Sequence, residues 1–220
     1  MCSHMFGHLQ PFGLSLLAME PVMSKAERTK QRIIEEAAVI FNEKGISGTS
    51  IEDVLKATKI AKGCLYGHFG SKEELSYASV DYLLAKVTER RDALMRKEKN
   101  AKCKILAFMD SNKKPLMPYI NGGCPLVNLA TESDDTNPVI KKKVRSAVNE
   151  TLKLLSGILM DGVESGEFSA ALNAEDFAMQ MFVAIEGANA LSRVLNSNKP
   201  MQVVISSFKK ELDLYCTVPT

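Results

Sequence analysis

Residues that commonly carry catalytic or metal chemistry are sparse in this chain of 220 residues. It has three histidines, His4, His8 and His68, and five cysteines, at positions 2, 64, 103, 124 and 216. The cysteine count is odd and contains no CxxC pair, a pattern that fits neither a disulfide framework nor a zinc site. We therefore expect free thiols in a reducing cytoplasm, with no bound metal and no cofactor.

A short nucleophile pattern, SxxK, occurs twice, at Ser111–Lys114 and at Ser207–Lys210. Neither pair has the accompanying motifs that SxxK enzymes carry, and a four-residue pattern arises by chance. The sequence therefore predicts that the protein is not an enzyme and has no catalytic residues.

Contact with a polyanion is a different chemistry, and the stretch AKGCLYGHFGSKEEL at 61–75 favours it. Lys62 and Lys72 lie at its two ends, where they could hold phosphates. Gly63 and Gly67 lie between them, although each glycine costs a helix about 1 kcal/mol relative to alanine. Glycine here makes sense if the backbone must approach another surface closely.

The same stretch divides into two helical faces. Leu65 and Phe69 are spaced i and i+4, which places both on one face that packs inward. Cys64 and Tyr66 flank the thin glycine face on the other side. His68 alone is expected to hydrogen-bond or cap rather than to catalyse.

Helical periodicity and capping signals organise the rest of the chain. Ser50 with Asp53, and Ser71 with Glu74, have the spacing of capping boxes at the starts of two helices. Gly45 supplies a helix stop. We predict an all-α fold of about nine helices, with no credible strand and no internal repeat.

A short capped helix, a tight turn and a second short helix make a helix-turn-helix, whose second helix enters the major groove of DNA in many regulators. The alternative is a three-helix packing unit in which the glycines only relieve crowding. Residues 24–97 hold 14 Lys and Arg against 11 Asp and Glu, whereas residues 98–220 hold 14 of each. This mild basic bias is compatible with nucleic-acid binding.

The segment TKQRIIEEAAVIFNEKGISGTSIEDVLKATKIAKGCLYGHFGSKEELSYASVDY resembles the DNA-binding domain of the TetR/AcrR family of transcriptional regulators. The elements GxxxTS, KGxLYxHF and SKEEL carry the resemblance over about 55 residues. It implies a three-helix DNA-binding domain, a linking fourth helix, a helical ligand-binding domain and a two-fold dimer that binds a pseudo-palindromic DNA operator.

The resemblance also assigns residues to DNA contact. Phosphate-contacting positions fall on Thr49, Tyr66, His68 and Lys72, and base-reading or closely approaching positions fall on Lys62, Gly63, Cys64 and Gly67. Ser50 belongs to the same matched GxxxTS element. Cys64 stands where Thr or Ser is usual and Gly67 where a larger side chain is usual, so base contacts are expected to be few.

The segment NGGCPLVNLATE contains Cys124, the cysteine of the second half whose position is most informative. Pro125 suits a first helical position, which puts Cys124 at the N-cap, where the helix dipole can lower the pKa of a thiol. The segment also resembles a branch of the family with Gly-Cys followed by Leu129 and Glu132, in some of whose members the cysteine senses electrophiles or oxidants. Two roles stay open, a sensor cysteine or a small residue that packs a kink.

A reversible effector, if one binds, is expected between the helices of the second half. Plain core is the favoured interpretation for any one of the candidate pocket residues, which are Phe108, Tyr119, Asn128, Phe177, Met181 and Ile185. The segment AIEGANAL presents a face of small residues for a dimer interface or for internal packing, made of Ala184, Gly187, Ala188 and Leu191.

The expected domains are an N-terminal extension at 1–23 without assigned function, a DNA-binding domain at 24–70, a connecting helix at 71–97 and an effector-binding and dimerisation domain at 98–220. No apolar run approaches the roughly 20 residues of a membrane helix, so no membrane partner is expected. The hypothesis is a cytoplasmic homodimeric repressor released from DNA by a small molecule of unknown identity or by cysteine modification. The alternative is a ligand-independent DNA-binding protein that acts through a protein partner.

Overall fold

The computed structural model describes residues 23–217, so the extension expected at 1–23 lies outside it except for Met23. Within this range the chain forms α-helices and no strand, apart from an isolated bridge between Phe168 and Cys216. The helices are α1 (Lys25–Lys44), α2 (Ile51–Thr58), α3 (Lys62–His68), α4 (Lys72–Met95), α5 (Ala101–Ser111), α6 (Pro125–Ser133), α7 (Pro138–Glu164), α8 (Ala174–Val194) and α9 (Lys199–Tyr215). The prediction of an all-α fold with about nine helices is confirmed.

Local sequence signals explain where these helices begin and end. Ser50 and Asp53 form a capping box at the start of α2, and Ser71 accepts a hydrogen bond from the backbone N–H of Glu74 at the start of α4. Gly45 follows α1 with a φ of 79°, a backbone conformation that glycine adopts without strain. The first helices are therefore specified largely by residues next to them in sequence.

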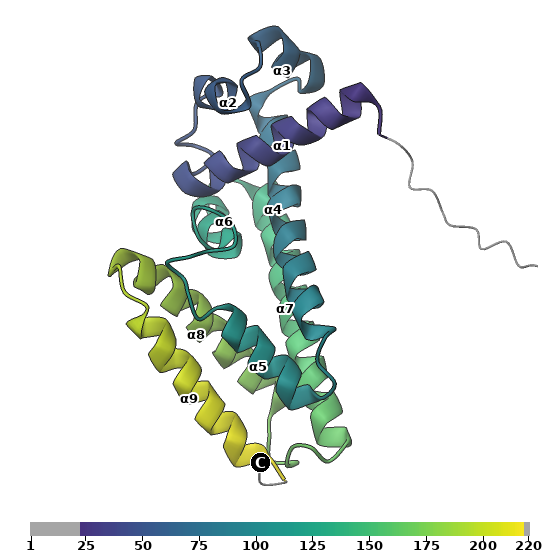
Figure 1. Cartoon of the computed structure of the whole chain (residues 1–220), viewed down its shortest axis with the longest axis vertical. Helices are drawn as coiled ribbons and strands as arrows, with labels where there is room; N and C mark the ends of the chain where they lie inside the picture. The colour runs from purple at the N-terminus through teal and green to yellow at the C-terminus, as the bar shows by residue number, and fades with distance from the viewer. Residues whose placement is uncertain (1–22, 218–220) are drawn as a thin grey trace, which may run out of the picture.

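The first three helices and the start of α4 form a small head around its own hydrophobic core (Figure 1). Leu65 and Phe69 of the third helical segment point into this core, as their spacing predicts. The fully enclosed residues of the head are Ile33, Ala37, Phe41, Val54, Leu65, Phe69 and Leu75.

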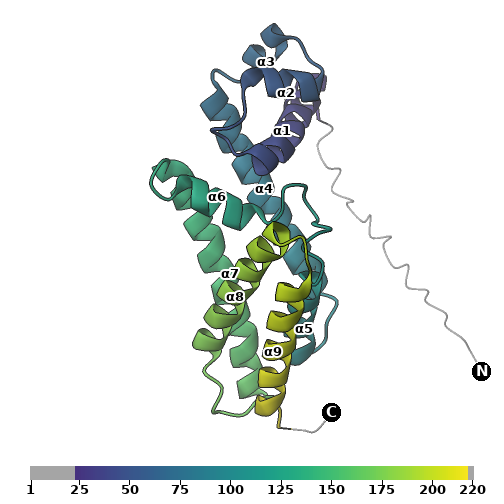
Figure 2. The ribbon, with the colours of Figure 1, turned by 90° about the vertical axis from the view of Figure 1, so that its left-hand side faces the viewer.

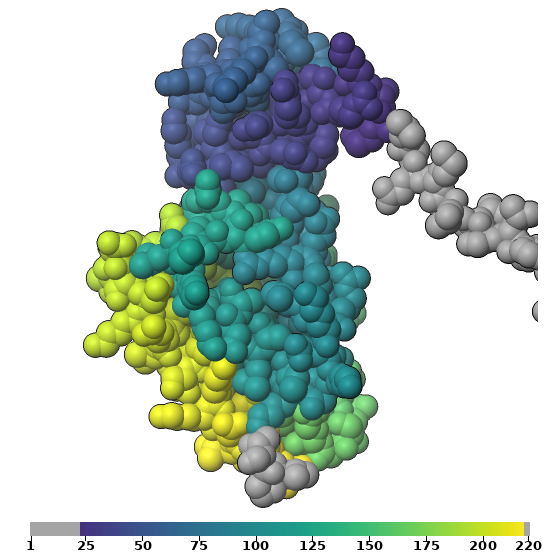
Figure 3. All heavy atoms as spheres, in the orientation of Figure 1, coloured from purple at the N-terminus to yellow at the C-terminus, as the bar shows by residue number. Residues whose placement is uncertain are grey.

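Helix α4 leaves the head and runs down the molecule beside α7, where α5, α8 and α9 complete a helical bundle (Figures 1 and 2). The short helix α6 crosses between the head and the bundle, and the teal α5–α6 region lies directly below the head in the space-filling view (Figure 3). Within residues 23–217 no helix combines the length and apolar character needed to cross a membrane.

Two glycines of α7 lie in different surroundings, one closely packed and the other open. A Cβ added at Gly162 would lie 2.4 Å from the Phe168 ring and 2.8 Å from the Ala101 methyl group, whereas a Cβ at Gly157 would meet nothing within 4 Å. Because both glycines lie in the same helix, replacing either by alanine gains about the same intrinsic helix propensity.

Gly162→Ala should therefore destabilise the protein by about 1–3 kcal/mol through overpacking. Gly157→Ala, its matched control, should stabilise it by up to about 1 kcal/mol through helix propensity. Urea unfolding followed by circular dichroism measures both, and equal effects of the two substitutions would contradict the close approach of α7 to Phe168.

Candidate functional site

The outer face of α3 is open to solvent and carries the residues that the sequence assigned to DNA. Lys62, Gly63, Cys64, Tyr66 and Gly67 are all exposed. Because their inward-facing neighbours are anchored in the head core, this face is held rigidly on the molecular surface at the tip of the head (Figure 1).

The packing of the head does not require either glycine of α3. A Cβ at Gly63 or at Gly67 would meet no atom within 4 Å, and neither residue has a positive φ. The cost of about 1 kcal/mol per glycine is therefore not offset by any contact within the protein. Both positions therefore leave open space in which the backbone of α3 could approach another surface.

The other residues assigned to DNA differ in their availability. Ser50 is exposed and caps α2, while His68 and Lys72 are half-buried at the end of α3 and the start of α4. Thr49 corrects the expectation, since it is only 1% exposed and its hydroxyl donates to the Gly45 carbonyl at 2.6 Å. Its side chain holds the turn before α2 and is not free to contact a phosphate.

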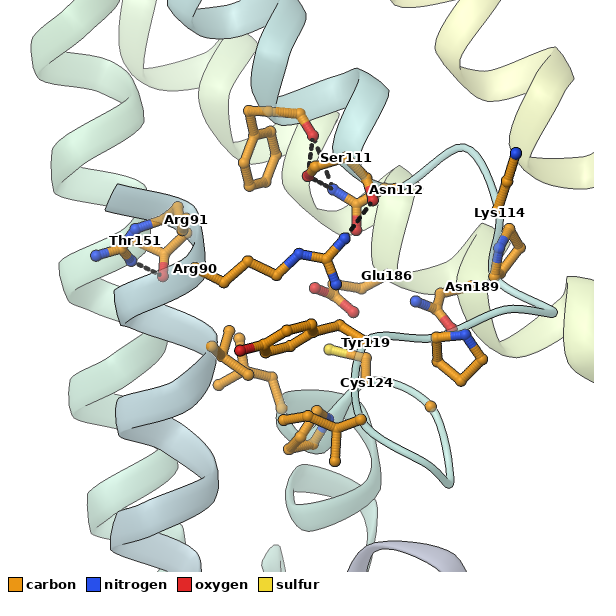
Figure 4. A pocket seen from close by; sticks show the side chains of 18 of the residues that line it. Arg90, Arg91, Ser111, Asn112, Lys114, Tyr119, Cys124, Thr151, Glu186 and Asn189 are labelled. Carbon is orange, nitrogen blue, oxygen red and sulfur yellow. Dashed lines mark hydrogen bonds between the residues drawn. The ribbon is translucent and has the colours of Figure 1, made fainter. Parts of the chain in front are cut away.

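A cavity of about 120 Å³ lies in the upper part of the bundle, between α4, α5, α8 and the segment 115–126 (Figure 4). Its apolar wall includes Val87, Leu94, Phe108, Ile120, Leu126 and Phe182. Its polar groups include Arg90, Asn112, Tyr119, Cys124, Glu186 and Asn189. An apolar cavity with a few convergent polar groups is the usual form of a small-molecule site.

The arginines of the cavity are engaged by the protein itself. The Arg90 guanidinium donates to the Ser111 carbonyl at 3.3 Å and lies 4.6 Å from the centre of the Tyr119 ring. Arg91 pairs with the neighbouring Asp92 at 2.8 Å and donates to the Thr151 hydroxyl at 2.7 Å. Both arginines are thereby fixed along the α4 wall.

Cys124 is half-buried and occupies the N-cap of α6 as predicted, and its sulfur lies beside the Glu186 carboxylate in the cavity (Figure 4). Burial raises the pKa of the Cys124 thiol well above its ordinary value, and the negative charge of Glu186 raises it further. The N–H groups of Val127 and Leu126 lower the pKa but contribute less. The helix dipole, which can lower the pKa of a thiol at this position, is therefore outweighed by desolvation.

The pocket residues expected from the sequence separate into two groups. Phe108, Tyr119 and Cys124 line the cavity. The other four do not, because Phe177, Met181 and Ile185 are core residues of α8 and Asn128 faces the head. Phe177, for example, packs edge-on against the rings of Phe208 and Tyr215.

Sequence reasoning missed Glu186, Arg90 and Asn189 as cavity residues. Glu186 carried a usable signal, since it is the only charged residue in the AIEGANAL segment, whose other residues are mostly small or apolar. Arg90 and Asn189 look like ordinary polar positions of long helices, and only the packing of α4 against the bundle shows that they face a cavity.

The loop that contains Cys124 also contacts the head. The Asn42 side chain at the end of α1 donates to the carbonyls of Asn121 and Gly123, at 2.6 and 3.1 Å. Asn128 of α6 in turn donates to the Asn42 side-chain oxygen at 3.0 Å and to the Gly122 carbonyl at 3.1 Å.

A second contact lies close to this one. The Glu132 carboxylate accepts the backbone N–H groups of Ile46 and Ser47, at 2.9 and 2.7 Å. These bonds tie α6 to the turn that follows α1, so the wall of the cavity is joined to the head at two places.

The small-residue face of α8 lies along a shallow apolar groove between α8 and α9. Ala184, Gly187, Ala188 and Leu191 all line it, together with Val203 and Val204 of α9. Leu191 is 57% exposed, and its apolar neighbours Leu195 and Val203 are exposed as well. This surface is unusually apolar for one that faces only water.

Cys64 and Cys124 should differ in reactivity, because Cys64 is exposed whereas burial and Glu186 keep the Cys124 thiol protonated. At pH 7.5 iodoacetamide should alkylate Cys124 at least about tenfold more slowly than Cys64, since each unit of raised pKa removes about tenfold of the thiolate. The rate at Cys124 should continue to rise as the pH is increased beyond 9. Peptide mass spectrometry of a time course measures both rates, and faster alkylation of Cys124 at neutral pH would contradict its buried setting.

Comparison with known proteins gives consistent matches. The family described as bacterial regulatory proteins, tetR family, matches residues 33–78, and the family described as tetracyclin repressor-like, C-terminal domain, matches residues 101–208. A TetR transcriptional regulator from Chloroflexus aurantiacus is 33% identical with a TM-score of 0.84, over 88% of this chain and 98% of that one. The transcriptional regulator TtgR of Pseudomonas putida is 26% identical over 74% of this chain and 79% of its own.

A more distant likeness extends to a solved complex with DNA. A cysteine mutant of the TetR family regulator CifR, complexed with a 26-bp double-strand operator DNA, is 16% identical with a TM-score of 0.71, over 83% of this chain and 95% of that one. At this identity the likeness concerns the fold alone. The two family matches and the Chloroflexus relative show that the chain belongs to the TetR family of transcriptional regulators.

Proposed function

We propose that the protein is a homodimeric repressor that binds operator DNA through α3 and leaves it when a small molecule occupies the cavity. One observation carries this proposal: the loop 121–124 lines the cavity through Gly123 and Cys124, and its carbonyls accept hydrogen bonds from Asn42 of α1 in the head. Residues 24–70 then act as the DNA-binding domain, 71–97 as the connecting helix and 98–220 as the effector-binding and dimerisation domain.

The exposed face of α3 supports the DNA contact. Its two open glycine positions allow the backbone to approach base edges, and Lys62 and Lys72 are available for phosphates. In a two-fold dimer the paired helices would reach successive major grooves about 34–36 Å apart, which favours a pseudo-palindromic operator.

The junction and α4 support a coupling of the cavity to the head. Arg90 on the cavity wall belongs to the same helix whose first turn packs in the head core through Leu75. Any movement of α4 or of loop 121–124 therefore changes the position of the head. A nearly complete switch needs a difference of about 5.5 kcal/mol in ligand affinity between the two states.

Reversible binding is favoured over cysteine modification as the signal. Cys124 lines the cavity, so an adduct on it would occupy the same space, but its thiol is held protonated beside Glu186. The presence of a formed cavity beside the junction also counts against the alternative of a ligand-independent protein that acts only through a protein partner.

Gly67→Ala tests the DNA contact. The substitution should stabilise the free protein by up to about 1 kcal/mol, because it improves a helix without meeting any neighbour. It should weaken operator binding by about tenfold, equivalent to 1.4 kcal/mol, because the added methyl group holds the backbone away from DNA. Fluorescence anisotropy at fixed salt, with DNA from the region upstream of the protein's own gene, measures the affinity.

The matched control for that experiment is Gly157→Ala, which also fills an open helical glycine but lies in α7. It should leave operator affinity unchanged. Undiminished affinity of Gly67→Ala would show that DNA does not approach this face, and absence of operator binding by the unmodified protein would overturn the proposed function itself.

Leu191→Glu tests the dimer. A carboxylate in the apolar groove of α8 and α9 should convert the dimer to a monomer at micromolar concentration, because a buried charge without a partner is strongly unfavourable. Analytical ultracentrifugation measures the association state. Exposed Glu175→Leu at the other end of α8 serves as the control, and a Leu191→Glu variant that remains dimeric would place the interface elsewhere.

A further inference from the structure

The cavity contains one acidic group whose hydrogen bonding is incomplete. The Oε2 atom of Glu186 is shielded from solvent and has no hydrogen-bond partner anywhere in residues 23–217. Buried polar atoms are nearly always paired, so an unpaired carboxylate oxygen calls for an explanation. In Figure 4 the Glu186 carboxylate lies in the centre of the cavity, between Arg90 and Cys124.

Charge pairing does not explain this oxygen either. No Lys, Arg or His nitrogen of the described chain lies within 4 Å of Glu186. Burial raises the pKa of Glu186, and the only neighbour that opposes the shift is the neutral Cys124 thiol. A buried carboxylate without a cation is costly, and such groups are concentrated at functional sites.

We infer that Glu186 is the recognition group for the effector and that the effector carries a protonated amine. This inference rests on the proposed function, because it names the chemical class of the molecule that the cavity takes. An ammonium group offers the N–H donors that Oε2 lacks and supplies the missing positive charge.

The rest of the cavity fits an amine attached to a small apolar body. The aromatic rings of Phe108, Tyr119 and Phe182 lie in its wall, and aromatic faces attract cations as well as apolar groups. Arg90 is the one cation aimed across the cavity, but its guanidinium is already bonded to the Ser111 carbonyl and stacked on Tyr119. Glu186 therefore lacks a hydrogen-bond donor, whereas Arg90 already has an acceptor.

Recognition at Glu186 would also act on the head. The thiol of Cys124 lies beside the same carboxylate, and the loop that carries this thiol is hydrogen-bonded to Asn42 of α1. An ammonium that attracts the carboxylate would draw it away from the thiol. The loop then loses one of the contacts that hold it against the cavity.

Three probes with one aromatic ring and a two-carbon linker test the inference: 2-phenylethylamine, 2-phenylethanol and 3-phenylpropionate, which are a cation, a neutral molecule and an anion at pH 7.5. Isothermal titration calorimetry on the full chain should show that the amine binds at least about tenfold more tightly than the alcohol, as a charge-assisted hydrogen bond predicts. The anion should bind most weakly.

Glu186→Gln should remove the preference, lowering the amine affinity by about tenfold and leaving the alcohol affinity within about threefold. Glu175→Gln, which neutralises an exposed glutamate in the first turn of the same helix, is the matched control and should change neither. If Glu186→Gln fails to fold by circular dichroism, the order of the three probes on the unmodified protein decides alone.

Equal affinities for amine and alcohol, tightest binding of the anion, no binding of the amine at millimolar concentration, or an amine preference that survives Glu186→Gln would each overturn the inference. Tightest binding of the anion would identify Arg90 as the recognition group instead. All four results leave operator binding by the ligand-free protein untouched, so they are distinguishable from a failure of the proposed function.

Discussion

The close approach of two backbones at Gly122 is the constraint on which the two halves of the molecule depend. A Cβ at this position would lie 2.4 Å from the Asn42 carbonyl oxygen, and the φ of 94° is itself a conformation that favours glycine. Because the backbones touch, Asn42 and Asn128 can satisfy their hydrogen bonds across the junction. The contact that fixes the head therefore also fixes the wall of the cavity.

Glycines serve opposite physical purposes in this molecule. Gly122 is required by contacts within the chain, since any side chain there collides with backbone. Gly67 is required by none, since a side chain there would meet no atom. Its place on the exposed face of α3 instead leaves room for the backbone to approach DNA, as the proposed function requires.

Sequence reasoning succeeded where the deciding interactions are local. The spacing of Leu65 and Phe69, the cap at Ser50 and the N-cap position of Cys124 all depend on residues within one helical turn. It favoured plain core for Phe177, Met181 and Ile185 but could not exclude them from the pocket, because an apolar helix position looks the same in sequence whether it faces a core or a cavity. Glu186 was missed because its importance comes from what surrounds it in space.

Cys124 shows how a distant segment overrides a local rule. The helix N-terminus does lower the pKa of its thiol, but such dipole effects are worth about 0.3–1 kcal/mol, whereas burying a charge costs several kcal/mol. The nearby Glu186 carboxylate from α8 then adds repulsion in the same direction as burial. The thiol consequently stays protonated beside the carboxylate, and the group in the cavity that lacks a partner is the carboxylate rather than the sulfur.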